Sequence, residues 1–253
     1  MDEIDYTQNR AAETSIALNA IQEEALDNLL KDGVSSTLRS TGNYSDNGLE
    51  ITTHDESDGS DSTLLIKGEE KSGSDFTGVY VNGEYDIERR EGGELSQEKA
   101  SFNLRHSHFD EFRGLSHYKV SMDRETASGQ PIESFDPAVS RLKSENGHLV
   151  YDQNNQPVRL AESTDGVNCK PDYSRPNTGK MDCEYILNDA ELGRLSFNMT
   201  RQKLGNGSME DRSVVRNLEG KVLAILNLNY KTDANGHLES AVASARRPKG
   251  YKD

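Results

Sequence analysis

The segment KVLAILNLNYKTDANGHLESAV, residues 221–242, decides the fold that the sequence predicts. Apolar or small residues occupy every second position of its first half: Val222, Ala224, Leu226, Leu228 and Tyr230. This period of two is that of a β-strand with one apolar face. Asp233–Gly236 then supplies a turn, and Leu238 and Val242 indicate a returning strand. The segment therefore predicts an antiparallel hairpin with one buried side.

The same turn chemistry recurs along most of the chain. Pairs rich in Asn, Asp and Gly separate short alternating runs at Asp32-Gly33, Asn47-Gly48, Asp58-Gly59, Asn82-Gly83, Gly92-Gly93, Asn146-Gly147, Asn154-Asn155, Asp165-Gly166, Asn206-Gly207 and Asn235-Gly236. Such pairs supply the positive φ angles of tight hairpin turns. We therefore expect a large antiparallel meander over residues 47–245, within one β-rich domain spanning 1–253. Asn82-Gly83 is expected to join a strand at Val81 to a strand at Tyr85.

Two segments depart from this pattern. Residues 11–31 predict the one convincing helix, with a narrow apolar stripe formed by Leu18, Ile21, Ala25 and Leu29. Core packing is the expected role of this stripe, and a coiled-coil stalk or membrane-proximal linker is the alternative, although two to three heptads are too few to indicate one. Residues 123–145 are polar and contain two prolines, so we expect a crossing segment between two halves of one sheet system, with a domain boundary as the alternative.

Composition limits how the sheet is covered. Only 32% of residues are hydrophobic, and the chain contains six Phe and no Trp. One face of most strands must therefore be solvated. The sequence predicts a mainly β fold, a large antiparallel meander with the N-terminal α-helix packed on it. Of the architectures that would cover the apolar side of this sheet, we expect a curved sheet or half-barrel first, a closed barrel second and a sandwich third.

Charge excludes one class of partner. The net charge is −15, whereas nucleic-acid binding needs clustered Lys and Arg. We therefore expect no nucleic acid as a partner, and an acidic, solvated surface.

The two cysteines indicate a compartment. Cys169 and Cys183 bracket a segment with two Pro and one Gly, and neither belongs to a Cys-x-x-Cys or zinc motif. A disulfide closing this loop of about 15 residues contributes roughly 3 kcal/mol in the chain-entropy model. We expect that disulfide, and with it an oxidising compartment, the periplasm or cell surface. The alternative is a pair of reduced thiols in a cytosolic protein.

The start of the chain carries no secretory signal. Residues 1–6 read MDEIDY, without a basic region or an apolar core, and no run approaches the roughly 18 apolar residues of a membrane span. We interpret the chain as a trimmed mature form with an added Met. If the protein is instead an envelope or surface interaction module, a membrane anchor next to the helix is also expected to have been lost. A cytosolic protein is again the alternative.

Two weak metal patterns occur. His106, His108 and Asp110 alternate, so on a strand two imidazoles and a carboxylate face the same side, a ligand set that suits zinc, copper or nickel. Residues 55–61 are rich in Asp and include Gly59, but they lack the ligand spacing of a calcium loop. Hydrogen-bonded strand histidines and a solvated hairpin tip are the simpler interpretations, so no cofactor is expected.

No motif of an enzyme active site accompanies the fold: the sequence has no GxSxG, Walker loop, dinucleotide fingerprint or HExxH. The leading hypothesis is an exported, non-enzymatic binding protein with an apolar ligand, such as a lipid or lipoprotein tail, on the covered concave face, by analogy with periplasmic lipid carriers. The expected lining residues are Phe197, Met199, Leu226, Leu228 and Tyr230. The alternatives are an envelope or surface module that binds a protein partner, and a metalloprotein using the histidine motif.

Overall fold

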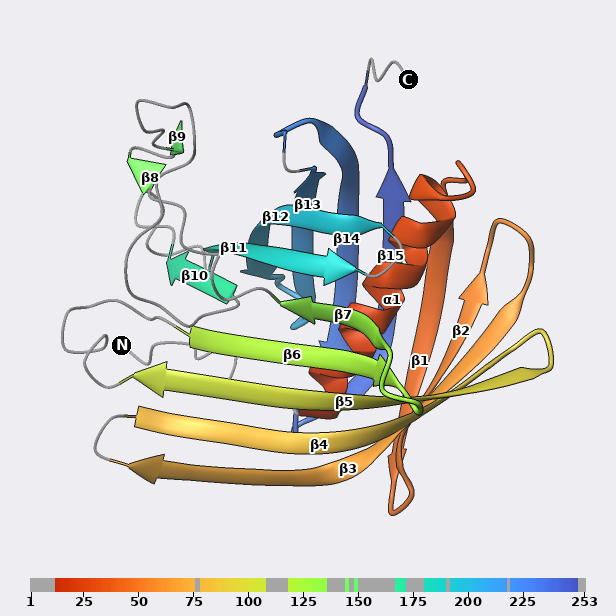
Figure 1. Ribbon diagram of the computed structural model, residues 1–253, viewed down its shortest axis with the longest axis vertical. Helices are drawn as coiled ribbons and strands as arrows, with labels where there is room; N and C mark the ends of the chain where they lie inside the picture. Colours follow the sequence, from red (N-terminus) through yellow and green to blue (C-terminus); the bar gives the residue numbers. More distant parts are fainter. Residues whose placement is uncertain are drawn as a thin grey trace.

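The computed structural model contains one helix and an extensive antiparallel sheet among the residues that it describes (Figure 1). These residues are 12–75, 78–107, 118–135, 144–145, 148–149, 167–171, 180–189, 192–217 and 219–249. The helix α1 spans Ala12–Leu30, as the sequence predicts. The fold class is also as predicted: mainly β, with the helix packed on the sheet.

The strands follow the helix in chain order. They are β1 Thr37–Ser45, β2 Gly48–Asp55, β3 Asp61–Asp75, β4 Gly78–Glu91, β5 Glu94–Ser107, β6 Tyr118–Thr126, β7 Pro131–Phe135, β8 Ser144–Glu145, β9 His148–Leu149, β10 Val167–Pro171, β11 Lys180–Asp189, β12 Gly193–Lys203, β13 Met209–Arg216, β14 Val222–Thr232 and β15 Leu238–Arg246. All except the short pair β8 and β9 belong to one sheet of 13 strands.

The sheet consists of two meandering arms that meet at a seam. β1 pairs with β15, so the first and last strands are neighbours. From this seam β2–β7 extend on one side and β14–β10 on the other, each strand pairing with the next. The sheet curves until β7 reaches β11, where Glu133–Phe135 pair with Leu187–Asp189. The described strands therefore form a strongly curved sheet, rather than a flat sandwich, and the far ends of its two arms meet only through this ladder of three residue pairs.

The expected crossing segment at 123–145 is wrong in its first part. Residues up to Thr126 belong to β6, and Pro131–Phe135 form β7. Pro131 is tolerated because it lies at the first position of β7, where its missing N–H disrupts the ladder least. Residues 136–143 lie outside the described part of the chain.

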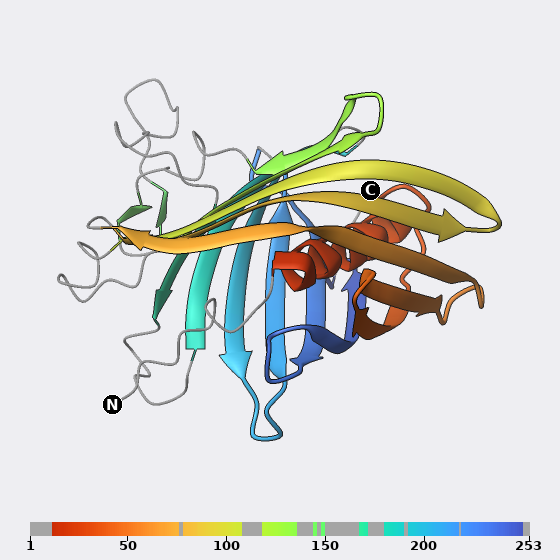
Figure 2. The same ribbon diagram turned by 90° about the horizontal axis from the view of Figure 1, so that it is seen from below.

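The helix lies inside the curve of the sheet. Figure 2 shows α1 between the strands β12–β15 and the strands β3–β5. Its main contacts are with β14 and β15 on one side of the seam and with β1–β4 on the other. It is not long and apolar enough to cross a membrane, and the described residues contain no other helix.

The buried surface of α1 is wider than the predicted stripe. Besides the four stripe residues, the buried apolar side chains include Ala12, Ile16, Ala17, Ala20 and Leu26. No residue of the helix is classed as exposed. A helix surrounded in this way takes most of its stability from tertiary packing rather than from helix propensity.

Small side chains on β15 allow the helix to approach the sheet closely. Ala241, Ala243 and Ala245 point inward and are buried, whereas Val242 is only half-buried. Leu238 and Val242, the two residues that indicated the returning strand, do not share one face, because the ladder between β14 and β15 contains an irregularity: Lys231 pairs with Ser240, but the next residue pairs with Leu238. This β-bulge switches the side-chain alternation. The bulge places alanines, not valine, beneath α1.

The predicted turn at Asn82-Gly83 is wrong. Both residues lie within β4, which runs without interruption and pairs with β3 and β5 on its two sides. Gly83 is required by packing rather than by a turn, since a Cβ there would lie 2.4 Å from the Tyr85 ring. The same ring also covers Gly68, the cross-strand partner of Tyr85. A glycine inside a strand thus marks a site of close approach.

Gly42 marks the closest approach of two backbones at the seam. A Cβ at this position would lie 1.9 Å from the carbonyl oxygen of Leu238. The ladder between β1 and β15 ends one residue earlier, at Thr41. Only glycine therefore allows β1 to pass over the start of β15 and continue its pairing with β2.

Replacement of Gly42 by Ala is expected to destabilise the fold, since a methyl group collides with backbone that cannot rotate away. We expect G42A to lower the free energy of unfolding by roughly 1–3 kcal/mol in urea denaturation. The control is G205A, because a Cβ at Gly205 meets nothing within 4 Å. Equal stability of the two variants would contradict the close approach at the seam.

Candidate ligand-binding site

The inward side of the curved sheet, which we call the interior face, carries all five predicted lining residues. Phe197 and Met199 are on β12, and the other three, Leu226, Leu228 and Tyr230, are on β14. All five are buried and belong to one cluster with α1. The structure therefore brings these residues together on one face, and their side chains form part of the hydrophobic core.

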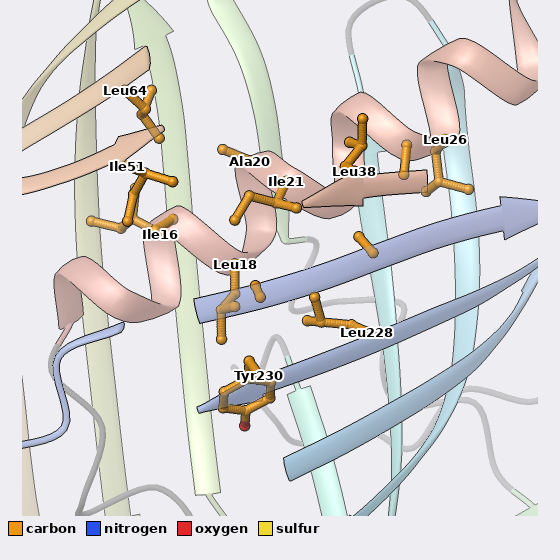
Figure 3. Packing of buried hydrophobic residues seen from close by; sticks show 14 of the residues in the cluster. Ile16, Leu18, Ala20, Ile21, Leu26, Leu38, Ile51, Leu64, Leu228 and Tyr230 are labelled. Carbon is orange, nitrogen blue, oxygen red and sulfur yellow. The ribbon is translucent and has the colours of Figure 1, made fainter. Parts of the chain in front are cut away.

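The helix packs on one part of this face. In Figure 3, Leu18 of α1 points toward Leu228 and Tyr230, while Ile16 points toward Ile51 on β2. Leu228 and Tyr230 thus lie beneath the helix. Phe197 and Met199 are on β12, beyond the strands with which α1 makes its main contacts. Inward residues of β5, β6 and β11 belong to the same cluster: Phe102, Met122 and Leu187.

A buried group of charges joins the helix to the sheet. Arg124 on β6 has a side chain only 2% exposed and forms ion pairs with two glutamates. Its Nη2 donates to Oε2 of Glu98 on β5 at 2.6 Å, and its Nε donates to the same oxygen at 3.2 Å. Its Nη1 donates to Oε2 of Glu23 on α1. A buried guanidinium needs such partners, because desolvation of an unpaired charge is costly.

A second arginine extends this group. The Nη1 atom of Arg89 on β4 donates to Oε2 of Glu24 at 3.2 Å, and Nε lies 3.8 Å from Oε1 of Glu98. Burial raises the pKa of Glu24 above its ordinary value of 4.5, although Arg89 acts to lower it, and the nearby carboxylates of Glu91 and Asp55 raise it further. We call Arg89, Arg124, Glu98, Glu23 and Glu24 the charged cluster.

A third buried arginine is paired within the sheet. Nε and Nη2 of Arg201 on β12 donate to the two carboxylate oxygens of Asp211 on β13, at 2.7 and 2.6 Å. The two residues are direct cross-strand partners. Beside them, Ser213 is buried, and its hydroxyl has no hydrogen-bond partner among the residues that the structure describes. The interior face is therefore apolar with a few buried polar groups.

Sequence reasoning missed these polar groups, although the sequence contains a signal for them. Arg201 follows Phe197 and Met199 at the same period of two, and Arg124 follows Met122 in the same way. A charged residue in phase with the apolar side of a strand points inward. On the helix, Glu23 and Glu24 carry no comparable signal, because adjacent glutamates are typical of a solvated surface.

Polar contacts also fix both ends of α1. Near its start, the Thr14 hydroxyl donates to the carbonyl oxygen of Gly236 at 2.9 Å. Near its end, the Asn28 amide donates to Asp55 Oδ2 at 2.8 Å, and Arg247 Nη2 donates to the carbonyl oxygen of Leu29 at 3.3 Å. A cation at this end also interacts favourably with the helix dipole. The position of the helix along the sheet is therefore defined by hydrogen bonds as well as by packing.

The structure describes little of the predicted metal site. The backbone of His106 lies in β5, opposite Val79 and Tyr118, while His108 and Asp110 lie outside the described residues. In the acidic run at 55–61, Asp55 is buried and accepts a hydrogen bond from Ser57, within the hairpin between β2 and β3. The described part of the chain contains no group of residues that could hold a metal ion.

The two cysteines lie opposite each other in the sheet. Cys169 on β10 and Cys183 on β11 are direct partners in an antiparallel ladder. Their side chains lie outside the part of the chain that the structure describes, and no disulfide is found within that part. The backbone alone therefore gives the relative position of the pair.

Comparison with known proteins gives no relative for this chain. It matches no protein-family model, no curated protein and no solved structure. Its function must therefore be inferred from its own residues.

The two helix glutamates are expected to respond differently to neutralisation. E23Q removes a charged partner of buried Arg124, so we expect the free energy of unfolding at neutral pH to fall by about 1–3 kcal/mol. E24Q removes a carboxylate whose ionised form is disfavoured by burial, so we expect little loss or a gain. Urea denaturation of both variants at neutral pH provides the measurement.

The pH dependence separates the two roles further. The raised pKa of Glu24 means that the folded state binds this proton more tightly than the unfolded state. Its contribution to stability is fully present below the ordinary pKa of 4.5 and is lost as the pH rises through the higher folded value. Wild-type protein should therefore lose stability relative to E24Q as the pH rises from 4.5 through the raised pKa of Glu24. An equal loss in E23Q and E24Q at neutral pH would contradict the assignment.

Proposed function

We propose that this protein is a non-enzymatic binding protein that holds an apolar ligand on the interior face of its sheet. One observation carries the proposal: the buried apolar lining continues from β14 to β12, beyond the strands that α1 mainly contacts. Phe197 and Met199 belong to that part, together with Phe102 and Met122 from the other arm. Ligand sites of this kind are concave and mostly apolar, with a few polar groups that fix orientation.

A second function is supported by a different observation. The five lining residues are buried together with the helix, so the protein's own side chains already form a core at this face. Such a fold can act as a scaffold, an envelope or surface module whose partner is another protein bound elsewhere. This alternative predicts that no small molecule accompanies the purified protein.

We also propose an exported, periplasmic or cell-surface location, supported by the position of the cysteines. Directly opposed residues of an antiparallel pair have Cα atoms about 4.5–5.5 Å apart. This separation lies within the roughly 4.4–6.8 Å that a disulfide allows. The register of Cys169 and Cys183 is therefore compatible with a disulfide, which an oxidising compartment would preserve.

The apolar-ligand proposal predicts a bound molecule that can be removed and replaced. Native mass spectrometry of protein purified without detergent is expected to show a mass above that of the chain, lost on delipidation. M199Q introduces an amide of similar size into the lining and should weaken rebinding of the extracted ligand about tenfold or more.

The neighbouring residue provides the control for this variant. N198Q changes an exposed side chain of the same strand that points away from the interior face, so it should leave ligand affinity unchanged. A single apo mass before and after delipidation, with no ligand extracted, would overturn the proposal and favour the scaffold.

The disulfide has its own test. A bond between Cys169 and Cys183 should survive denaturation without a reductant, and the double variant C169S/C183S should lose roughly 2–4 kcal/mol of stability. Two titratable thiols in protein isolated from its native host, with alkylation performed before lysis, would refute both the bond and the location inferred from it.

A further inference from the structure

Four hairpin turns among the described residues share one hydrogen-bond pattern. In each, the carbonyl of the first residue accepts a hydrogen bond from the N–H of the fourth, a glycine, and the N–H of the first donates to the carbonyl of the fifth. The glycines have similar positive φ angles, between 80° and 84°. The turns span residues 126–130, 204–208, 217–221 and 233–237. Because their backbones match, their side chains can be compared position by position.

In three of these turns a polar side chain at the first position caps the turn. The N–H of the fifth residue donates to that side chain: to Thr126 Oγ1 at 3.1 Å, to Asn217 Oδ1 at 2.9 Å and to Asp233 Oδ1 at 2.9 Å. A side-chain acceptor of this kind hydrogen-bonds the local backbone and holds it in the turn conformation. These three turns are therefore restrained by their first residue.

The turn at 204–208 lacks such a cap, because its first residue is Leu204. The N–H of Ser208 donates instead to Oδ1 of Asn206 at 3.0 Å, and Oγ of Ser208 donates to the same oxygen at 2.6 Å. Asn206 and Gly207 are both exposed. One side-chain carbonyl thus receives two hydrogen bonds directly beside the backbone nitrogen of a glycine.

Two hydrogen bonds to a carboxamide oxygen favour nucleophilic attack on its carbon. When a nucleophile adds to Cγ of Asn206, Oδ1 gains negative charge, and donors already aimed at it bind the oxyanion more strongly than the neutral carbonyl. The nucleophile next in sequence is the nitrogen of Gly207, which has no side chain to obstruct it. Its N–H must first leave the carbonyl of Leu204, and no capping side chain at the first position opposes that opening.

We propose that Asn206 is a site of spontaneous deamidation that its own turn promotes. The Gly207 nitrogen forms a bond to Cγ of Asn206, the bond between Cγ and Nδ2 breaks, and the proton of the Gly207 N–H leaves with Nδ2 as ammonia. Water then opens the succinimide ring at either carbonyl, which gives aspartate or isoaspartate at position 206. Each product adds one negative charge to the tip of the hairpin between β12 and β13. The reaction needs no ligand, so it does not depend on the apolar-ligand function.

Two other asparagines that precede glycine provide internal comparisons. Asn235 occupies the same third position of its turn, but the N–H of His237 donates to the capping Asp233 and not to Asn235. Asn82 lies within β4, where pairing on both sides holds the backbone extended. In the folded protein we therefore expect deamidation at Asn206 to be several-fold faster than at Asn235, and deamidation at Asn82 to be the slowest.

The measurement follows the replacement of amide by carboxyl in tryptic peptides of the full-length protein, incubated at mildly alkaline pH. The peptides Leu204–Arg212, Thr232–Arg246 and Ser72–Arg89 carry the three asparagines separately. Electron-transfer fragmentation distinguishes aspartate from isoaspartate, and an unincubated sample corrects for deamidation during digestion. A parallel incubation in urea is the reference, because the unfolded chain has no turns and its three Asn-Gly pairs should react at similar rates.

Two substitutions should slow the reaction at Asn206 in the folded protein. S208A removes one of the two donors and should lower the rate roughly two- to tenfold, the effect of one lost hydrogen bond. L204D restores the cap that Asp233 provides in the equivalent turn and should lower the rate similarly. Both effects should disappear in urea. The matched control is S128A, which changes a serine of the turn at 126–130 and should leave the rate at Asn206 unchanged.

The outcomes are decisive in both directions. A folded-state preference for Asn206 that is lost in urea and reduced by S208A would support the proposal. Equal rates at Asn206 and Asn235 in the folded protein, or a rate at Asn206 that S208A raises or leaves unchanged, would overturn it. Either of these results would mean that the hydrogen bonds to Oδ1 restrain the Asn206 side chain and do not activate it.

Discussion

The packing of α1 against the interior face is the constraint on which the rest of the structure depends. A long antiparallel sheet with one apolar side must cover that side, and a chain with 32% hydrophobic residues has little apolar material for a second layer. One helix buried over most of its surface provides much of that cover. The alanines of β15 let the helix approach the sheet closely, and the glycine at the seam lets β1 approach the start of β15.

Burying a helix on several sides places some of its polar residues in the interior as well. Glu23 and Glu24 are neutralised there by Arg124 and Arg89, which come from strands far away in sequence. Replacing such buried pairs by apolar residues is often neutral or stabilising, so their presence alone is weak evidence for added stability. What the pairs do provide is a set of directed contacts between the helix and the strands β4 and β6.

The alternating strands, most hairpin turns and the helix could be predicted because each depends on local sequence. Gly207 and Gly236, for example, have positive φ angles of 84° at predicted turns. Asn82-Gly83 has the same local signal but lies within a strand, because the Tyr85 ring needs the space that a side chain would fill. The bulge in β15 and the closeness of β1 to β15 could not be predicted either. Both depend on pairing between distant segments.

In the candidate site, too, only the features that depend on local sequence could be predicted. The apolar lining was predictable, because Phe197 and Leu228 belong to regular alternating strands. The charged cluster was not, because nothing in the local sequence distinguishes Glu23 from a solvated helix residue or relates it to Arg124, 101 positions away. Long-range electrostatic pairs of this kind become visible only when the fold brings their elements together.

Native-state amide hydrogen exchange tests most directly the claim that α1 belongs to the interior of the sheet. Backbone amides beyond the first turn of the helix should exchange as slowly as those of β14 and β15, because the helix can open only when the core around it opens. Protection of α1 should also fall together with that of these strands as urea is added. Rapid exchange along residues 16–30, while β14 and β15 stay protected, would contradict the account.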